Sequence, residues 1–259
     1  MKNIINYDID FSKIDVSVKK YLYIHNDIYR WMEINIESNK EKLVKISNSE
    51  ILCEPFWNDE LLLTWNKEID DLINLEEIEM KKYLKNNPNF WIFVRETVKK
   101  KILNINNNLK NKGYYLSLKI WYRPLEVQKK LFNTIFQYFE NKYKEDKNPQ
   151  EIYDETIQMI SDPSKNFSPH VTGWAVDVVL YNKSWKIVDM WCPVNFIWEK
   201  SYLTTTDITE KQKENRNILT DNFLEWGFSC LCSEWWHFSY WDPYWAKFYW
   251  KKEALYWMI

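Results

Sequence analysis

The stretch SPHVTGWAVDVVL, residues 168–180, combines polar side chains with an apolar run. His170 precedes Asp177 by seven positions, and Gly173 lies between them. Glycine adopts backbone conformations that turn the chain sharply, so a loop here can bring both side chains to one point. The valine-rich run around Asp177 predicts a strand over 175–181. We therefore expect a turn that leads into a strand, with His170 and Asp177 close together.

A second stretch, SEWWHFSY over residues 233–240, predicts another strand and holds Glu234 and His237. Residues three apart in a regular strand point to opposite faces. These two side chains can therefore share a site only where a bulge or a turn intervenes. Without one, Glu234 is a surface carboxylate.

The chain has three histidines, and His25, in an ordinary amphipathic stretch, is expected to be structural. Two imidazoles and one carboxylate, from His170, His237 and Asp177, give a tetrahedral zinc ion three protein ligands and leave its fourth position for water. That arrangement is typical of catalytic rather than structural zinc. The remaining carboxylate, Glu234, is then free to act as a general base on the water.

The rest of the pattern predicts an α+β fold, in which a small antiparallel sheet carries the zinc site and helices flank it. Apolar residues at spacings of three and four predict helices, and alternating or apolar runs predict strands, with 175–181 and 186–190 joined as a hairpin through 182–185. One strand, 115–121, is expected to have a single buried face. The expected helices are 94–109, 124–139, 151–160 and 218–226, and the expected strands are 115–121, 175–181, 186–190 and 233–240.

Composition excludes several classes of function. The 259 residues, 46% hydrophobic and 28% charged, suffice for a substantial core. A net charge of −2 gives no basic field, so nucleic acid is not an expected partner. The chain lacks an apolar run of about 18 residues, so no membrane partner is expected. The N-terminal stretch lacks the apolar segment of a secretory signal, and four scattered cysteines favour a reduced, cytoplasmic protein.

The two stretches resemble the signatures Ser-x-His-x-x-Gly-x-Ala-x-Asp and Glu-x-Trp-His of zinc D-alanyl-D-alanine dipeptidases, relatives of D,D-carboxypeptidases and lysostaphin-type peptidases. The resemblance covers roughly residues 88–250, because further segments occur in the family's order: VRETVKKKIL, WYRPLEVQKKLF, MWCPVNFIWEKSY and EWWHFSYWDPYWA. It implies that His170, Asp177 and His237 bind one Zn²⁺ per chain and that Glu234 is the catalytic acid/base. A small D-configured peptide is the implied substrate.

The same resemblance assigns roles to residues near these stretches. Arg123, in a Tyr-Arg-Pro motif, is implied to stabilise the tetrahedral oxyanion; the alternative is a surface ion pair. Tyr122 and Ser168 are implied to contact the substrate, although Ser168 can equally cap a turn.

One position departs from the family pattern. The family's Met-Gly-Thr/Ser-x-Phe-Asp segment ends in an aspartate that contacts the free amino group of the dipeptide, and here that substrate-binding position is Asn195. An amide accepts a hydrogen bond from an ammonium group but does not balance its charge. A D,D-carboxypeptidase or amidase acting on longer or N-modified peptides is therefore an alternative, as is a zinc-containing binding module without catalysis.

The second departure concerns glycine. Four motif positions that hold glycine in the family hold tryptophan here: Trp121, Trp174, Trp191 and Trp241. Trp185 occupies the tip of the expected hairpin, where turn geometry favours Gly, Asn or Asp. The 3 glycines and 16 tryptophans together make up about 7% of the chain, which is the usual share of glycine alone. Some bacteria read the codon UGA as glycine, whereas a common alternative code reads it as tryptophan. We hypothesise that several of these tryptophans are glycines in the natural product.

The sequence also suggests a division of the chain. Residues 86–259 are expected to form the catalytic domain, and residues 1–85 an N-terminal extension packed on it. The sequence is silent on oligomeric state.

Overall fold

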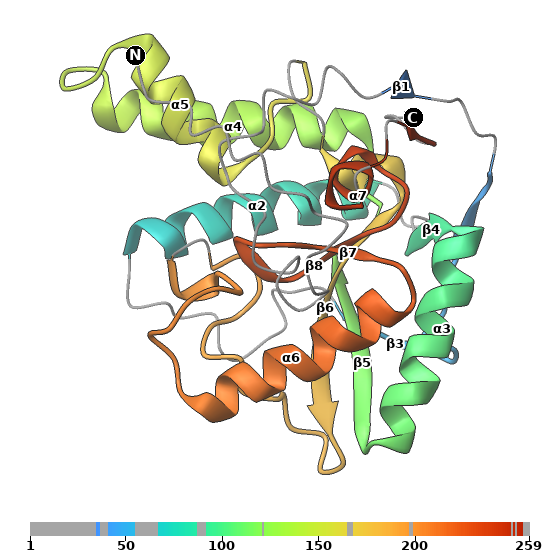
Figure 1. The fold of residues 1–259 in the computed structure, drawn as a ribbon. Helices are drawn as coiled ribbons and strands as arrows, with labels where there is room; N and C mark the ends of the chain where they lie inside the picture. Colours follow the sequence, from blue (N-terminus) through green and yellow to red (C-terminus); the bar gives the residue numbers. More distant parts are fainter. Residues whose placement is uncertain are drawn as a thin grey trace.

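A computed structural model of the protein describes residues 35–36, 41–54, 67–86, 92–120, 122–164, 168–196, 199–249, 251 and 253–255, so His25 and Trp121 lie outside the described residues. Helices and strands are mixed along the chain (Figure 1). The strands are β1 (Asn35–Ile36), β2 (Leu43–Lys45), β3 (Leu52–Cys53), β4 (Phe93–Arg95), β5 (Tyr114–Ile120), β6 (Ala175–Asn182), β7 (Ser229–Leu231), β8 (Glu234–Ser239) and β9 (Glu253–Ala254). The α-helices are α2 (Lys67–Asn86), α3 (Glu96–Asn111), α4 (Leu125–Tyr143), α5 (Pro149–Met159), α6 (Glu210–Glu225) and α7 (Pro243–Phe248), with short 3-10 helices η4 (Pro169–Thr172) and η5 (Glu199–Ser201).

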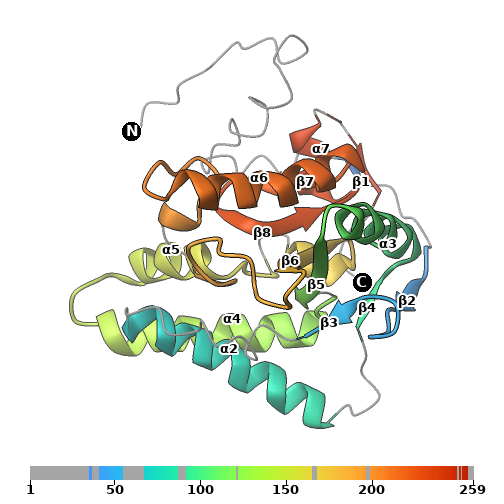
Figure 2. The ribbon, with the colours of Figure 1, turned by 90° about the horizontal axis from the view of Figure 1, so that it is seen from below.

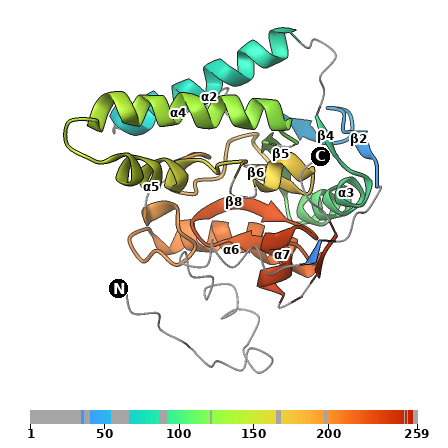
Figure 3. The same cartoon turned by 90° about the horizontal axis from the view of Figure 1, so that it is seen from above.

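The main sheet has five strands in the order β3-β5-β6-β8-β7. The pairs β5–β6, β6–β8 and β7–β8 are antiparallel, as expected, while β3 joins β5 in parallel. Figures 2 and 3 show α2 and α4 side by side on one side of this sheet, and α6 and α7 on the other. The α+β architecture is thus confirmed, with a sheet that is mixed because residues 52–53 supply its parallel edge strand.

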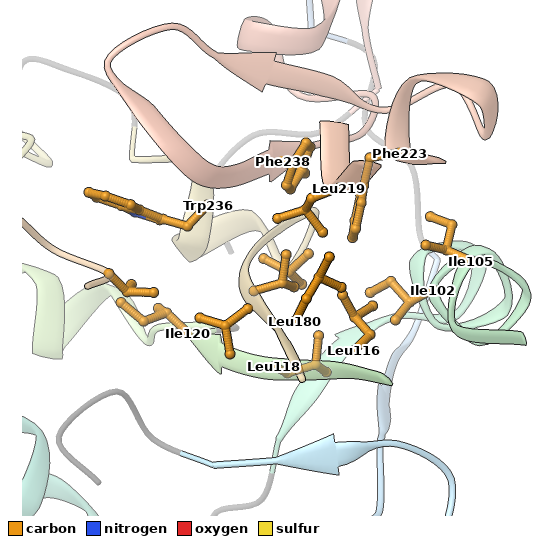
Figure 4. Close-up of a cluster of buried hydrophobic side chains, with 14 of the residues drawn as sticks. Ile102, Ile105, Leu116, Leu118, Ile120, Leu180, Leu219, Phe223, Trp236 and Phe238 are labelled. Atoms are coloured by element: carbon orange, nitrogen blue, oxygen red, sulfur yellow. The ribbon is translucent and has the colours of Figure 1, made fainter. Parts of the chain in front are cut away.

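The core lies between the sheet and helices α3 and α6 (Figure 4). Helix α3 and strands β5 and β6 contribute aliphatic side chains to it, and α6 and β8 contribute aromatic ones, together with Leu219 of α6. The Phe223 ring of α6 stacks on Phe238 of β8 with centroids 4.0 Å apart, which joins the helix to the strand that carries His237. The predicted stripe of α4 is also buried: Val127, Leu131, Ile135 and Phe139.

Four local expectations are wrong. The helix expected over 218–226 begins already at Glu210, where Thr209 caps it, and ends at Glu225. Val94 lies in β4, because the helix begins only at Glu96. Strand β5 is buried on both faces, since Ser117 and Lys119 are as inaccessible as their apolar neighbours. Lys119 is tolerated there because its ammonium pairs with Glu54, 3.4 Å away. The strand expected over 186–190 is reduced to one bridge between Tyr181 and Ile187, although the hairpin turn itself is present.

The turns bear on the glycine hypothesis. Among the described residues, four that are not glycine have positive φ: Trp185 (56°), Trp191 (79°), Trp241 (57°) and Asn195 (66°). Trp174 is not among them and is buried in the main core, 1% exposed, with its ring stacked on Tyr240. Three of the five suspect tryptophans therefore occupy a backbone conformation that suits glycine.

In the part of the chain that the structure describes, no helix is long and apolar enough to cross a bilayer.

Candidate active site

His170 is presented by the short helix η4, which ends at Gly173. Gly173 has φ 73°, and a Cβ there would lie 2.5 Å from the Cδ2 atom of Leu43. The positive φ therefore favours glycine at this turn, which the sequence predicted, and a Cβ would in addition displace the end of the Leu43 side chain. The His170 carbonyl accepts a hydrogen bond from the Arg123 amide at 2.9 Å, which ties the turn to the segment after β5.

Asp177 and His237 are direct partners across the antiparallel pair β6–β8. Side chains at paired positions lie on the same face of a sheet. Nδ1 of His237 lies 2.9 Å from Oδ1 of Asp177, and Nε2 of His170 lies 3.4 Å from Oδ2 of the same carboxylate. One ligand atom from each residue falls within 4.8 Å of the others, and all three residues are buried. The predicted juxtaposition of His170, Asp177 and His237 is therefore present.

Glu234 reaches the same point because β8 is irregular. Opposite β7, Phe238 pairs with Cys230 but Glu234 pairs with Leu231, so the register shifts between these pairs. This is the bulge that the spacing of Glu234 and His237 required. Oε2 of Glu234 lies 3.8 Å from Nδ1 of His237, and the glutamate side chain is 24% exposed, against 4% for the histidine. Glu234 thus faces both the cluster and the solvent.

The protonation states of the cluster follow from burial and from its single central carboxylate. Burial lowers the pKa of His170, and the Asp177 charge only partly opposes this. Burial also acts against the charged form of His237, but the hydrogen bond that His237 donates to Asp177, together with the negative charges of Asp177, Glu234 and Asp242, outweighs it and raises the pKa. Burial alone would raise the pKa of Asp177, whereas the two histidines hold it well below its usual range. Asp177 is therefore ionised, as a metal ligand must be.

Arg123 lies beside the cluster, and its charge contributes to lowering the pKa of His170. The side chain is only 4% exposed, so the alternative of a surface ion pair is wrong. Its Nη1 donates to Oε1 of Gln128 at 2.8 Å. Sequence reasoning missed Gln128, for which the only signal was its place in the first turn of the helix that Arg123-Pro124 opens.

The expected substrate-binding residues are less closely assembled. Ser168 is 3% exposed and precedes η4, but its side chain makes no capping hydrogen bond, so the turn-cap alternative finds no support. Tyr122 is partly buried, and its amide donates to the Phe93 carbonyl. Asn195 lies in the loop 188–196 with positive φ, a conformation that asparagine tolerates better than most residues. Their roles toward the substrate stay predictions.

Two residues not predicted from the sequence hold the loop 188–196 in place. Arg216 of α6, 2% exposed, donates to the carbonyls of Met190, Lys200 and Tyr202. Sγ of Cys192 accepts from the Trp235 indole of β8 at 3.2 Å. The loop is thereby fastened to the strand that carries Glu234 and His237. A buried arginine in a helix is not a signal that sequence spacing can reveal.

The residues of the cluster fit zinc. Two imidazoles and an ionised carboxylate, buried together, are the nitrogen and oxygen donors that catalytic zinc uses, and a nearby carboxylate that is not needed as a ligand completes such a site. Fold and site together define a mononuclear zinc hydrolase.

The family model described as D-ala-D-ala dipeptidase matches residues 79–253, and the chain belongs to that family. This confirms the resemblance drawn from the motifs. The family is zinc-dependent, so the expected cofactor, Zn²⁺, is also confirmed. The predicted boundary near residue 85 stays a prediction.

Comparison with solved structures finds similar folds at low identity. The vancomycin resistance D,D-pentapeptidase VanY, a variant from a VanB-type cassette in complex with Zn(II), is 13% identical with a TM-score of 0.41, covering 86% of this chain and 96% of that one. VanYB in complex with D-alanine-D-alanine is 12% identical with a TM-score of 0.42, covering 82% and 86%. The LD-carboxypeptidase LdcB is 19% identical with a TM-score of 0.37, covering 60% and 62%. Comparison with curated proteins finds no match. Similarity at this level assigns no residue roles.

Proposed function

We propose that the protein hydrolyses D-alanyl-D-alanine, or a similar D-configured dipeptide, in the cytoplasm. The observation that carries the proposal is the position of Glu234, whose Oε2 lies 3.8 Å from Nδ1 of His237 because β8 is bulged. A protein that only stored or displayed zinc would have no use for a partly exposed carboxylate beside the proposed ligands. All four cysteines are thiols rather than members of a disulfide, which favours a reducing compartment.

When bound, zinc would polarise the carbonyl of the substrate's peptide bond and lower the pKa of the water molecule that attacks it. Glu234 accepts the proton of the attacking water and delivers it to the leaving amine, for which its solvent-facing position suits it. Arg123 donates to the oxygen on which negative charge develops, and its burial strengthens that interaction. Asp177 has no proton to exchange, because the two histidines keep it ionised.

Recognition of the substrate's amino end distinguishes two candidate functions. Asn195 can accept a hydrogen bond from an ammonium group, and Ser168 and Tyr122 would complete the contacts. The second candidate, a D,D-carboxypeptidase or amidase that takes longer or N-modified peptides, is favoured by Asn195, because a neutral amide gives a free ammonium no counter-charge.

The test offers zinc-loaded protein equal concentrations of D-Ala-D-Ala and of its N-acetyl derivative, with release of D-alanine as the readout. We expect cleavage of the free dipeptide. Exclusive cleavage of the acetylated compound would refute the dipeptidase and establish the carboxypeptidase. Binding of zinc and of either compound without any release of D-alanine would establish the binding module instead.

A further inference from the structure

The two imidazoles of the cluster are supported differently. Each turns one nitrogen toward Asp177: Nε2 of His170 lies 3.4 Å from its carboxylate, and Nδ1 of His237 lies 2.9 Å from it. The other nitrogen of His170, Nδ1, is buried and has no hydrogen-bond partner among the described residues. The other nitrogen of His237, Nε2, lies 3.1 Å from the hydroxyl oxygen of Ser239. A side chain therefore holds the His237 ring on the side that faces away from Asp177.

The direction of this hydrogen bond follows from the chemistry of a metal ligand. Nδ1 of His237 faces Asp177 and Glu234, so it is the nitrogen that zinc would take, and it must lose its proton to bind. A neutral imidazole carries one proton, which then lies on Nε2 and is donated to Oγ of Ser239. A hydroxyl that accepts in this way still has its own proton to donate. Ser239 is 1% exposed, so that proton needs an acceptor within the protein.

A buried carboxyl lies close to this hydroxyl. Asp242 has no exposed surface; its Oδ1 caps α7 by accepting from the Trp245 amide at 2.8 Å, while Oδ2 has no hydrogen-bond partner among the described residues. The chain bends between β8 and α7, where Trp241 has φ 57°. Burial raises the pKa of the Asp242 carboxyl to about 6, and the Trp245 amide and the Ser239 hydroxyl partly oppose the rise. The carboxyl of Asp242 is thus an acceptor that the Ser239 hydroxyl can reach.

We propose that Ser239 is a positioning residue for His237: its hydroxyl accepts a hydrogen bond from Nε2, donates one to the buried carboxylate of Asp242, and thereby keeps Nδ1 directed into the metal site. The proposal rests on the zinc-dependent function proposed above, with His237 as a ligand. Hydrogen bonds to the outer nitrogen of a ligating histidine fix its tautomer and ring orientation, and their loss lowers metal affinity about 10- to 100-fold. The proposal is therefore tested on zinc binding rather than on activity.

The first experiment compares Ser239→Ala with Ser229→Ala. Ser229 of β7 pairs with Ser239 and is also 1% exposed, but its hydroxyl donates to the Ser239 carbonyl rather than to an imidazole. Zinc dissociation constants are measured by competition with a chelator of known affinity. We expect Ser239→Ala to bind zinc about 10- to 100-fold more weakly than wild type and Ser229→Ala to stay within about threefold. Wild-type affinity in Ser239→Ala would overturn the proposal, as would an equal loss in both variants.

The proton on Nε2 gives a readout that a general loosening of the site would not produce. The chain has three histidines, so a nuclear magnetic resonance spectrum of protein with isotope-labelled histidine holds few ring signals. In zinc-loaded wild type we expect His237 to carry its proton on Nε2, with the downfield resonance of a hydrogen-bonded proton. That resonance should move upfield in Ser239→Ala and stay in place in Ser229→Ala. A His237 ring with its proton on Nδ1 in the zinc-loaded wild type would overturn the proposal.

Asp242→Asn tests the far end of the arrangement. The amide oxygen can still cap α7, but the second acceptor of the carboxylate is replaced by a donor. We expect zinc affinity to fall about 3- to 10-fold, while the metal-free variant is no less stable than wild type. A loss of zinc affinity without a loss of stability cannot come from a damaged fold. Unchanged zinc affinity would overturn the part assigned to Asp242.

These measurements separate the proposal from the proposed function. Wild-type protein that binds zinc but releases no D-alanine from D-Ala-D-Ala would refute the hydrolase, and the zinc affinities and ring signals would still decide the role of Ser239. Wild-type zinc affinity and an unmoved Nε2 proton in Ser239→Ala would refute the positioning role and leave the hydrolase intact.

Discussion

The strands β6 and β8 and the loop 188–196 lie side by side in the site but differ in how their residues are used. Strand β6 carries Asp177 and strand β8 carries His237; both residues are buried, and the two side chains are joined by a hydrogen bond. The loop holds Trp191 and Asn195, both with positive φ, and is fastened by bonds to its backbone and to Cys192. The strands carry the residues that we propose as zinc ligands, whereas the loop carries Asn195, which we propose to contact the amino end of the substrate. If both proposals hold, catalysis and substrate choice depend on separate parts of the molecule.

The largest expected loss of activity comes from a change in β6, at Asp177. Asp177→Asn keeps the shape of the side chain but removes the charge that holds both histidines and that zinc requires. We expect zinc content after dialysis to fall close to zero and kcat/KM to fall at least about 10³-fold. Asp154→Asn, at a surface-facing position of α5, is the control. Full zinc binding by Asp177→Asn would remove Asp177 from the ligand set.

The next effect concerns the cation beside the strands. Arg123→Lys keeps a positive charge but loses the planar fork of donors, one of which bonds Gln128 and another of which we propose to face the developing oxyanion. Steady-state kinetics on D-Ala-D-Ala should show a loss of about 10²-fold in kcat with little change in KM. A variant with unchanged kcat would show that charge alone suffices at this position.

A change in the loop 188–196 should alter the preference between substrates rather than the overall rate of hydrolysis. Asn195→Asp supplies a carboxylate for the substrate's ammonium group, so the ratio of kcat/KM for D-Ala-D-Ala to that for N-acetyl-D-Ala-D-Ala should rise about 10-fold. Zinc content should stay the same. An unchanged ratio would show that Asn195 does not contact the amino end of the substrate. The proposed division of roles between the strands and the loop would then be wrong.

The smallest effect is on stability, at the end of β8. Asp242 is fully buried, and burial raises its pKa from 3.8 to about 6. The folded protein therefore binds this proton more tightly than the unfolded chain, and the residue's contribution to stability falls as pH rises from about 4 to about 6. Asp242→Asn keeps the N-cap of α7, which accepts from the Trp245 amide. Chemical unfolding should show the variant about 1 kcal/mol more stable than wild type above pH 6, with the difference vanishing below pH 4. A variant less stable at pH 7 would contradict this account.

The residues of the candidate site could be predicted from the sequence more completely than the residues that pack around them. The spacing of His170, Gly173 and Asp177 predicted the turn and strand from local geometry alone. The odd spacing of Glu234 and His237 left two alternatives, a shared site with a bulge or turn and a surface carboxylate, and the register shift in β8 decides for the first. The parallel edge strand β3 and the burial of Lys119 depend on partners more than 60 residues distant in sequence, such as Glu54. Arg216 and Gln128 act through buried hydrogen bonds that no periodicity records. Local sequence patterns therefore identify the residues of the candidate site, whereas the residues that support the site depend on long-range packing.

The most direct test of the central claim compares wild-type protein with Glu234→Gln, using Glu140→Gln on the exposed face of α4 as the control. Zinc per chain and the rate of D-alanine release from D-Ala-D-Ala are measured on the same samples. We predict equal zinc in all three proteins, wild-type rates for the control, and a loss of about 10²- to 10⁴-fold for Glu234→Gln. Undiminished hydrolysis by zinc-loaded Glu234→Gln would contradict the assignment of the bulged strand's carboxylate as the acid/base of the reaction.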